Sequence, residues 1–228
     1  MNQLEAMGNP SIKNTLMKHG AREPFFGVKV EDLKKIVKKV KKNYELSLEL
    51  YETGNTDAMY LAGLIADEKK MTKDDLNNWV KGAYWHYISE YTVPWVAAES
   101  DYGVELASEW LNSTEETIVA AAWGTFSYIL SVKNDEDIDF GLILSLLEKA
   151  EKEIHQSQNR VKYAMNGFVI SVGSYYKPLA EKAMKVAEQI GKVNVIMGST
   201  ACKVPLATEY IEKTVQRTQY KKRKSARC

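Results

Sequence analysis

The sequence predicts an all-α protein, a HEAT- or armadillo-like superhelix of roughly ten helices. Apolar residues recur with a helical period in nearly every segment, and alternating segments are too few to build a sheet. Predicted helix pairs follow one another at intervals of about 35–40 residues, which is typical of HEAT-like repeats. Each pair of such a stack buries its apolar face against the next pair. A compact bundle without repeats is the alternative, because no sequence motif recurs.

Three segments in the first half of the chain have clear helical patterns. In Val30–Lys42 apolar residues recur at i, i+3, i+4 and i+7, and lysines occupy the opposite face. The helix predicted in Asn55–Met71 begins with an asparagine, a favoured N-cap. The helix predicted in Thr72–Trp85 begins with a threonine followed three residues later by Asp75, which is a capping-box pattern.

Four segments complete the helices of the second half. Ser113–Leu130 begins with a serine followed by Glu116, and this spacing predicts a second capping box. The others are Glu136–Ile154, Asn159–Gly173 and Tyr175–Gly191. The glycines that close the last two segments stand where helices commonly stop.

Composition excludes several classes of protein. Apolar residues make up 45% of the 228 residues and charged residues 27%, which is ordinary for a soluble globular protein. No long uncharged apolar run predicts a membrane span, and the N-terminus lacks the pattern of a signal peptide. The two cysteines, Cys202 and Cys228, and the three scattered histidines form no metal-ligand motif. We therefore expect a cytoplasmic monomer without a metal or another cofactor.

Charge is distributed unevenly along the chain. Residues 213–228 hold seven basic and no acidic residues, whereas the other 212 residues hold 24 basic and 30 acidic residues, a net charge of −6. We therefore divide the chain into one helical-repeat domain, residues 1–212, and a basic C-terminal tail, residues 213–228. Such a tail is either solvated and disordered or in contact with nucleic acid. In both cases we expect deletion of Tyr220–Cys228 to leave the melting temperature nearly unchanged, because charged termini rarely pack. The candidate nucleic-acid-binding residues are Arg160, Lys162, Lys221, Lys222, Arg223, Lys224 and Arg227.

Both ends of the chain resemble a known family. The stretch Glu23–Val40 contains FGVK followed by a leucine and two lysines, and it resembles the entry to the DNA alkylation repair family of AlkD-like HEAT-repeat proteins. Ala201–Thr214 and Tyr220–Cys228 resemble the C-terminal end of a bacterial branch of this family. The resemblance implies a superhelix with a concave, DNA-sized face. It also implies a relation to DNA glycosylases that excise positively charged N-alkylated purines such as 3-methyladenine and 7-methylguanine.

The family's catalytic set is a tryptophan, an aspartate four residues later and an arginine from the next repeat. Alignment of this chain's YTVP with the family motif places the tryptophan position on Glu90 and the aspartate position on Pro94. The arginine position falls on Ala120, and no arginine occurs between Arg22 and Arg160. The resemblance therefore implies a branch in which all three catalytic roles are vacant.

The stretch Ile88–Val96 is interpreted as a helix junction at the former active site, with Pro94 in a first helical turn, where its missing N–H costs little. Glu90, Trp95 and Glu99 are the remaining catalytic candidates, and the last two keep an i, i+4 spacing. A tryptophan at helical spacing is more often a core residue, and a glutamate is more often solvated or paired with lysine. An aromatic ring, a carboxylate and a cation within about 5 Å of one another here would favour catalysis.

Three functions remain open at this point. The first is a DNA-binding HEAT-repeat scaffold with lost or weak glycosylase activity, favoured by the basic tail and by seven lysines within residues 29–42. The second is an active DNA glycosylase that uses Glu90 or Glu99. The third is a protein-interaction scaffold without a nucleic-acid role, favoured by the acidic balance of residues 1–212.

Overall fold

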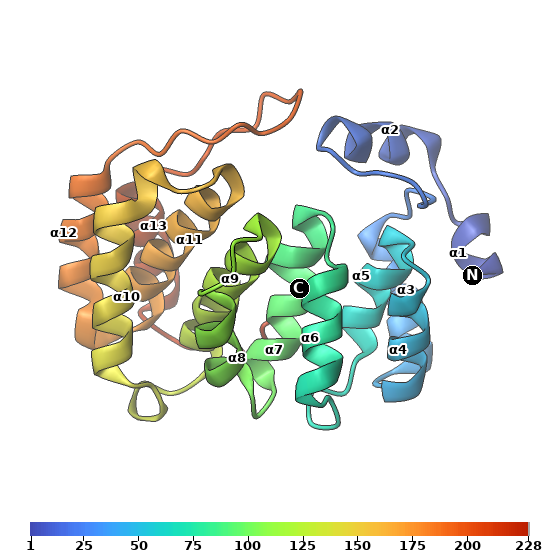
Figure 1. Cartoon of the computed structure of the whole chain (residues 1–228), viewed down its shortest axis with the longest axis horizontal. Coiled ribbons are helices and arrows are strands. Elements are labelled where there is room, and N and C mark those ends of the chain that lie inside the picture. Colours follow the sequence, from blue (N-terminus) through green and yellow to red (C-terminus); the bar gives the residue numbers. More distant parts are fainter. Residues whose placement is uncertain (228) are drawn as a thin grey trace.

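The protein is helical throughout residues 1–227, the part that the computed structural model describes (Figure 1). This confirms the predicted all-α class, and no strand occurs in those residues. There are more helices than the roughly ten expected, because residues 1–22 form two short helices and residues 93–110 divide into two. The α-helices are α1 (Asn2–Ala6), α2 (Pro10–Lys18), α3 (Val30–Val40), α4 (Tyr44–Glu52), α5 (Thr56–Ile65), α6 (Lys73–Gly82), α7 (Val93–Glu99), α8 (Gly103–Trp110), α9 (Glu116–Val132), α10 (Phe140–Glu153), α11 (Asn159–Tyr175), α12 (Ala180–Ile190) and α13 (Ala207–Thr218).

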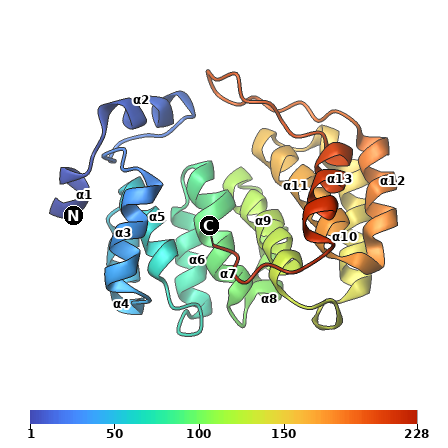
Figure 2. The same ribbon diagram turned by 180° about the vertical axis from the view of Figure 1, so that it is seen from behind.

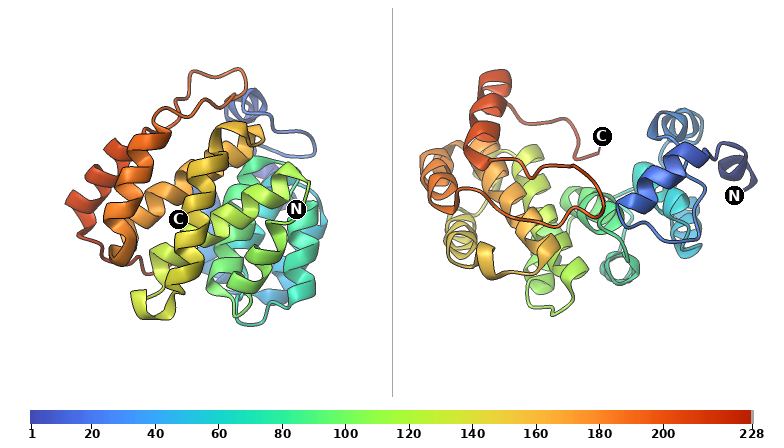
Figure 3. Two further views of the ribbon diagram at one scale, coloured as in Figure 1. Left: turned by 60° about the vertical axis from the view of Figure 1, so that its left-hand side comes forward. Right: turned by 90° about the horizontal axis from the view of Figure 1, so that it is seen from above.

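The helices are stacked along an arc. Helices α5, α7, α9, α11 and α13 contact one another in that order, and α4, α8 and α12 pack on this row. Seen from above, in the right-hand view of Figure 3, the stack is curved and the C-terminal residues lie inside the curve. We call this inner side the concave face; it is the side turned to the reader in Figure 2.

The core continues through the stack as two apolar clusters. One lies in the N-terminal half and includes Leu33, Ile65 and Trp95; the other lies in the C-terminal half and includes Trp123 and Phe168. All ten residues of α5 are buried, since the helix is enclosed by its neighbours. A helix buried on every side needs no polar face.

Several local predictions are confirmed. Asn55 caps α5, where its side chain accepts the backbone N–H groups of residues 57 and 58. Thr72 and Asp75 form the reciprocal capping box of α6. Gly191 ends α12 with a positive φ of 54°, a conformation that glycine adopts without the steric cost of a side chain.

Two predicted helix ends are wrong. Helix α9 begins at Glu116 without a side-chain cap, and the Glu116 carboxylate instead accepts the backbone N–H of Arg160 at 2.7 Å. Gly173 does not end α11, which continues to Tyr175. A Cβ at Gly173 would lie 2.6 Å from Ile211 of α13, so this glycine allows the two helices to approach closely.

The FGVK turn is organised around one buried carboxylate. Asp57 of α5 accepts the backbone N–H groups of Phe26, Gly27 and Val28 at 2.5, 3.0 and 2.9 Å. Gly27 has φ 78°, and a Cβ there would lie 2.6 Å from the backbone nitrogen of Lys13. The turn therefore has a structural role, because it joins the N-terminal helices to the stack.

The proline in Ile88–Val96 lies at a helix junction, as expected. Residues Ile88–Thr92 form one π-helical segment, η1, and α7 follows with Pro94 in its first turn. Neighbouring helices approach this junction through glycines: a Cβ at Gly63 of α5 would lie 2.6 Å from Thr92 Cγ2, and one at Gly124 of α9 would lie 3.0 Å from Pro94 Cγ. Wider π-turns of this kind occur frequently at functional sites.

The end of the basic tail is packed rather than solvated. Figure 2 shows it running from α13 across the concave face. Lys222 Nζ donates to the carbonyls of Leu130 and Tyr175 at 2.8 and 2.7 Å, near the C-termini of α9 and α11. Arg227 donates to the carbonyls of Gly63 and Ala66 at the C-terminus of α5, at 2.8 and 3.0 Å. Cations stabilise helix C-termini, where carbonyls lack partners and the helix dipole is negative.

Two carboxylates complete the binding site of the tail. Glu68 and Glu99 accept from Arg227 Nη1 at 3.0 and 3.1 Å, and Glu99 also accepts the backbone N–H of Ala226 at 2.9 Å. The expectation of a solvated terminus is therefore wrong for these residues. The boundary drawn at residue 213 falls inside α13, and the non-helical tail begins at Gln219.

Replacement of Arg227 by alanine is expected to lower the free energy of unfolding by about 2–4 kcal/mol, because two largely buried carboxylates lose a cation. Urea denaturation followed by circular dichroism measures the change. The matched control is Arg217→Ala on the exposed side of α13, for which a change within about 0.5 kcal/mol is expected. Equal effects of the two substitutions would show that the tail does not hold the stack together.

Candidate nucleic-acid interface

A buried ion pair lies at the helix junction. Arg160 at the start of α11 donates from Nε and Nη2 to the two carboxylate oxygens of Glu90 at 2.6 and 2.5 Å. The Glu90 side chain is 5% exposed and that of Arg160 is 14% exposed, so this bidentate pair is largely removed from water. It connects η1 with α11, which are separated along the chain by 70 residues.

Burial and the charge of Arg160 shift the pKa of Glu90 in opposite directions. Burial raises the pKa of the Glu90 carboxyl to about 7, and the guanidinium of Arg160 opposes this shift. Arg160 is positioned by other contacts as well: its guanidinium carbon lies 4.5 Å from the centre of the Tyr163 ring, and its backbone N–H is held by Glu116. A carboxylate, a cation and an aromatic ring therefore do converge at this junction.

A cleft of about 210 Å³ opens beside the ion pair between η1, α9 and α11. Its walls carry four tyrosines, Tyr91, Tyr128, Tyr163 and Tyr175, and Arg223 of the tail stands at its edge. Glu90 of the ion pair also lines the cleft, and the remaining residues are small or hydroxylated: Gly124, Ser127, Ser131, Ala164, Gly167 and Ser171. The cleft thus combines aromatic surface with hydroxyl groups and one exposed cation.

Sequence reasoning named Glu90 and Arg223 but missed the other residues of this cleft, although a signal was present. Tyr163, Gly167, Ser171 and Tyr175 recur every four residues and form one stripe along α11. The stripe is less apolar than the remainder of the helix, and this contrast marks a face that does not enter the core. The pairing of Glu90 with Arg160 had no local signal, because it joins distant segments.

The other two catalytic candidates have different surroundings. Trp95 is 1% exposed and makes edge contacts with Tyr60 and Tyr128, at centroid distances of 5.3 and 6.4 Å. It is a core residue. Glu99 binds Arg227 and the backbone of the tail, so its carboxylate anchors the C-terminus.

The candidate nucleic-acid-binding residues divide into two groups. Arg160, Lys222 and Arg227 are engaged in ion pairs inside the protein. Lys221, Arg223 and Lys224 are exposed, and Lys162 is half-buried on α11. Three exposed cations therefore lie within four residues of the tail, which crosses the concave face.

Residues 1–227 contain neither a helix suited to spanning a membrane nor a cluster of metal-ligating side chains. No helix there is both long enough and apolar enough to cross a bilayer. Their histidine, cysteine, aspartate and glutamate side chains nowhere form a group of three or more suited to holding a metal ion.

Comparison with known proteins identifies the family. Residues 1–211 match the family model described as DNA alkylation repair enzyme. The chain belongs to this DNA alkylation repair family. Two curated relatives are uncharacterized proteins of Listeria monocytogenes and Listeria innocua; each is 33% identical, and the alignments cover 95% and 94% of this chain and 96% and 95% of theirs.

One solved structure is similar over its whole length. It is 39% identical, with a TM-score of 0.91, and the alignment covers 100% of this chain and 97% of that chain. It is described as belonging to a new family of proteins related to the HEAT-like repeat DNA glycosylases, with affinity for branched DNA structures. This likeness supports the HEAT-like superhelix predicted from the sequence.

The three positions to which the sequence analysis assigned the family's catalytic roles hold no free functional group. Glu90 is paired with Arg160, Pro94 is buried in the first turn of α7, and Ala120 is fully buried in α9. Arg160, from α11, is the arginine that reaches the junction, and it binds a protein carboxylate.

In the ion pair, Glu90 and Arg160 each neutralise the buried charge of the other, and we expect this to stabilise the fold. The single substitutions Glu90→Leu and Arg160→Met should each lower the free energy of unfolding by about 3–5 kcal/mol, because each leaves one buried charge without its partner. The double variant should lose clearly less than the sum of the two, which urea denaturation of all four proteins measures. Additive losses would mean that the two side chains act independently.

His86 should make the fold sensitive to acid. Burial, followed by the nearby charge of Arg160 and by His19, lowers the pKa of His86 from 6.5 to about 3. Between these values the unfolded chain binds a proton that the folded protein does not, so stability declines as pH falls through this window. The expected slope from this group is up to about 1.4 kcal/mol per pH unit. The contribution of His86 is the difference in the pH dependence of unfolding free energy between the parent and His86→Phe, which share all other titrating groups. Identical pH profiles of the two proteins would contradict this prediction.

Proposed function

We propose that this protein binds branched DNA on its concave face and does not excise alkylated bases. The observation that carries the proposal is the likeness over the whole chain, at 39% identity and a TM-score of 0.91, to a protein described as having affinity for branched DNA. The fold offers a curved surface that the tail crosses. Lys221, Arg223 and Lys224 of the tail are exposed. Exposed cations of this kind bind phosphates and release counterions.

The state of Glu90 supports the absence of base excision. A catalytic carboxylate must be free to stabilise the positive charge that develops on the sugar. Both oxygens of Glu90 are bound to the guanidinium of Arg160, which already neutralises the carboxylate. Pro94 and Ala120 offer neither a carboxylate nor a cation.

A second candidate, an active glycosylase, is favoured by one observation. Glu90, Arg160 and Tyr163 bring a carboxylate, a cation and an aromatic ring together at the junction. This function requires the ion pair to open when DNA binds. It is tested separately from DNA binding.

DNA binding is tested with a four-way junction and a linear duplex that share arm sequences, by fluorescence anisotropy at several salt concentrations. We expect tighter binding of the junction and an affinity that falls with salt, with a log–log slope of about −0.9 per phosphate contact. Replacement of Lys221, Arg223 and Lys224 by alanine should weaken binding and flatten this slope.

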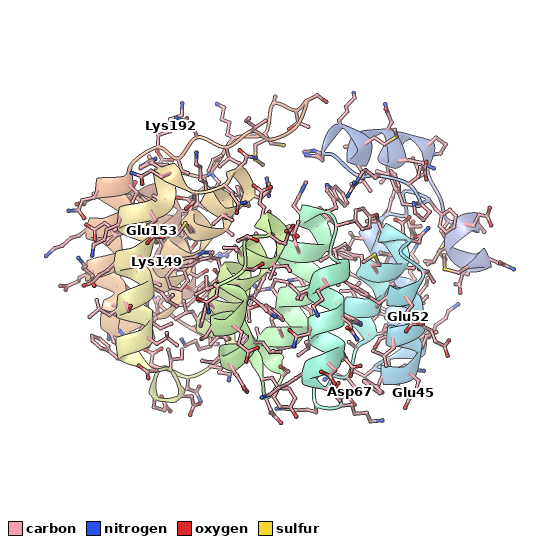
Figure 4. The ribbon with its side chains drawn as sticks, in the orientation of Figure 1. Glu45, Glu52, Asp67, Lys149, Glu153 and Lys192 are labelled. Carbon is pink, nitrogen blue, oxygen red and sulfur yellow. The ribbon has the colours of Figure 1, made fainter. Side chains whose placement is uncertain are left out.

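The matched control replaces three basic residues away from the tail, Lys149, Lys152 and Lys185, on α10 and α12. Lys149 is labelled beside Glu153 in Figure 4, and the two form an ion pair at 2.9 Å on the side facing away from the tail. This variant should bind the junction as the parent does. Absence of binding to either DNA would favour a protein-interaction scaffold instead.

Base excision is tested with methylated duplex DNA, followed by chromatography of released bases. No 3-methyladenine or 7-methylguanine should appear above background, since each missing electrostatic group costs about 10²–10³ in rate. Should the parent release either base, Glu90→Gln and Glu99→Gln identify the carboxylate responsible. Loss of release in one folded variant would establish the glycosylase function.

A further inference from the structure

We propose that the tyrosine-lined cleft beside Glu90 binds a single unpaired, uncharged DNA base, with the adjoining phosphate at Arg223. This inference rests on the proposed binding of branched DNA, because a branch point is a place where a base can be left unpaired and outside the duplex stack. It assigns a binding role to the tyrosines and serines of the cleft, which do not stand at the positions aligned with the family's catalytic residues.

The size and chemistry of the cleft suit one flat ring system. Its volume of about 210 Å³ is below the roughly 300–1,000 Å³ typical of drug-sized ligands. Tyr91, Tyr128, Tyr163 and Tyr175 supply aromatic surface, and stacking on such rings accommodates every base because each base has a π-face. Ser127 and Ser131 donate their hydroxyl hydrogens to backbone carbonyls, which leaves their oxygens able to accept.

Charge decides which kind of base fits. The carboxylate of Glu90 is neutralised by Arg160, so the wall of the cleft holds no free negative charge to attract a cationic, alkylated base. The cation left exposed is Arg223, whose guanidinium carbon lies 6.0 Å from the centre of the Tyr128 ring. A neutral ring in the cleft with an anionic phosphate at its edge matches this arrangement.

The tail fixes this cation in place. The backbone N–H of Arg223 donates to the carbonyl of Ser131 at 2.7 Å, and the adjacent Lys222 holds the carbonyl ends of α9 and α11. The basic tail therefore supplies one edge of the cleft. Lys222 packs the tail against the helices, and the neighbouring Arg223 binds a phosphate in this proposal.

Gly167 provides a way to fill the cleft without disturbing the fold. It lines the cleft in the middle of α11, and a Cβ placed there meets no atom within 4 Å. Gly167→Met therefore extends into the empty space, and replacing glycine within a helix favours the helix. The matched control is Gly141→Met, at an exposed position near the start of α10.

The experiment compares three otherwise identical junctions: one fully paired, one with a single unpaired adenine at the branch point, and one with an abasic site at that position. The parent should bind the adenine junction about 5- to 100-fold more tightly than the abasic one, the range expected for one stacked base. Gly167→Met should bind the adenine and abasic junctions equally, with the parent's affinity for the fully paired junction and a melting temperature at or slightly above that of the parent, because the glycine of a helix is replaced. Gly141→Met should behave as the parent does.

Equal binding of the adenine and abasic junctions by the parent overturns the proposal, as does a base preference that survives in Gly167→Met. Binding of the fully paired junction separately tests the proposed function. If no junction binds, calorimetric titration with the dinucleotide d(ApA) tests the cleft directly. Binding by the parent but not by Gly167→Met supports the site, and absence of binding by both overturns it.

Discussion

The ion pair between Glu90 and Arg160 is the interaction on which the concave face depends. It joins η1 to α11 across α9, and it is bidentate and largely buried. A buried charge without its partner is costly, so the two helices are held in one relative position. The same pairing occupies both oxygens of the carboxylate beside the cleft. One contact therefore stabilises the middle of the stack and determines the charge of the cleft.

The C-terminal tail has a related role on the same face. The carbonyl ends of α5, α9 and α11 point toward it, and Arg227 and Lys222 bind them directly. A stack of helices contacts mainly its nearest neighbours, so its ends and middle are weakly coupled. The tail connects helices from both halves of the chain through charge-assisted hydrogen bonds. It also leaves three cations within four residues exposed for phosphate binding in the proposed function.

The residues of the junction show how the packing of neighbouring helices positions a charged side chain. Pro94 needs a first-turn position, and the π-helical turn of η1 provides it. Gly63 and Gly124 allow α5 and α9 to approach that turn. The resulting geometry directs Glu90 toward Arg160 rather than toward solvent. The cleft is thereby left with tyrosines, hydroxyls and a peripheral arginine, a set suited to binding.

The sequence alone determined the helical class and the helix ends at Asn55, Thr72 and Gly191, because these follow from periodicity and from capping chemistry within a few residues. The spacing of the helix pairs favoured the stacked architecture. It also indicated the family through the FGVK turn and the C-terminal segment. Tertiary structure alone decided that Glu90 meets Arg160, that Arg227 meets Glu68 and Glu99, and that a stripe on α11 lines a cleft. These contacts join residues 70 to 159 positions apart, and their partners are chosen by the packing of whole helices. The predicted helix-end roles of Gly173 and Glu116 were wrong for the same reason, because the residues that these two contact lie on other helices.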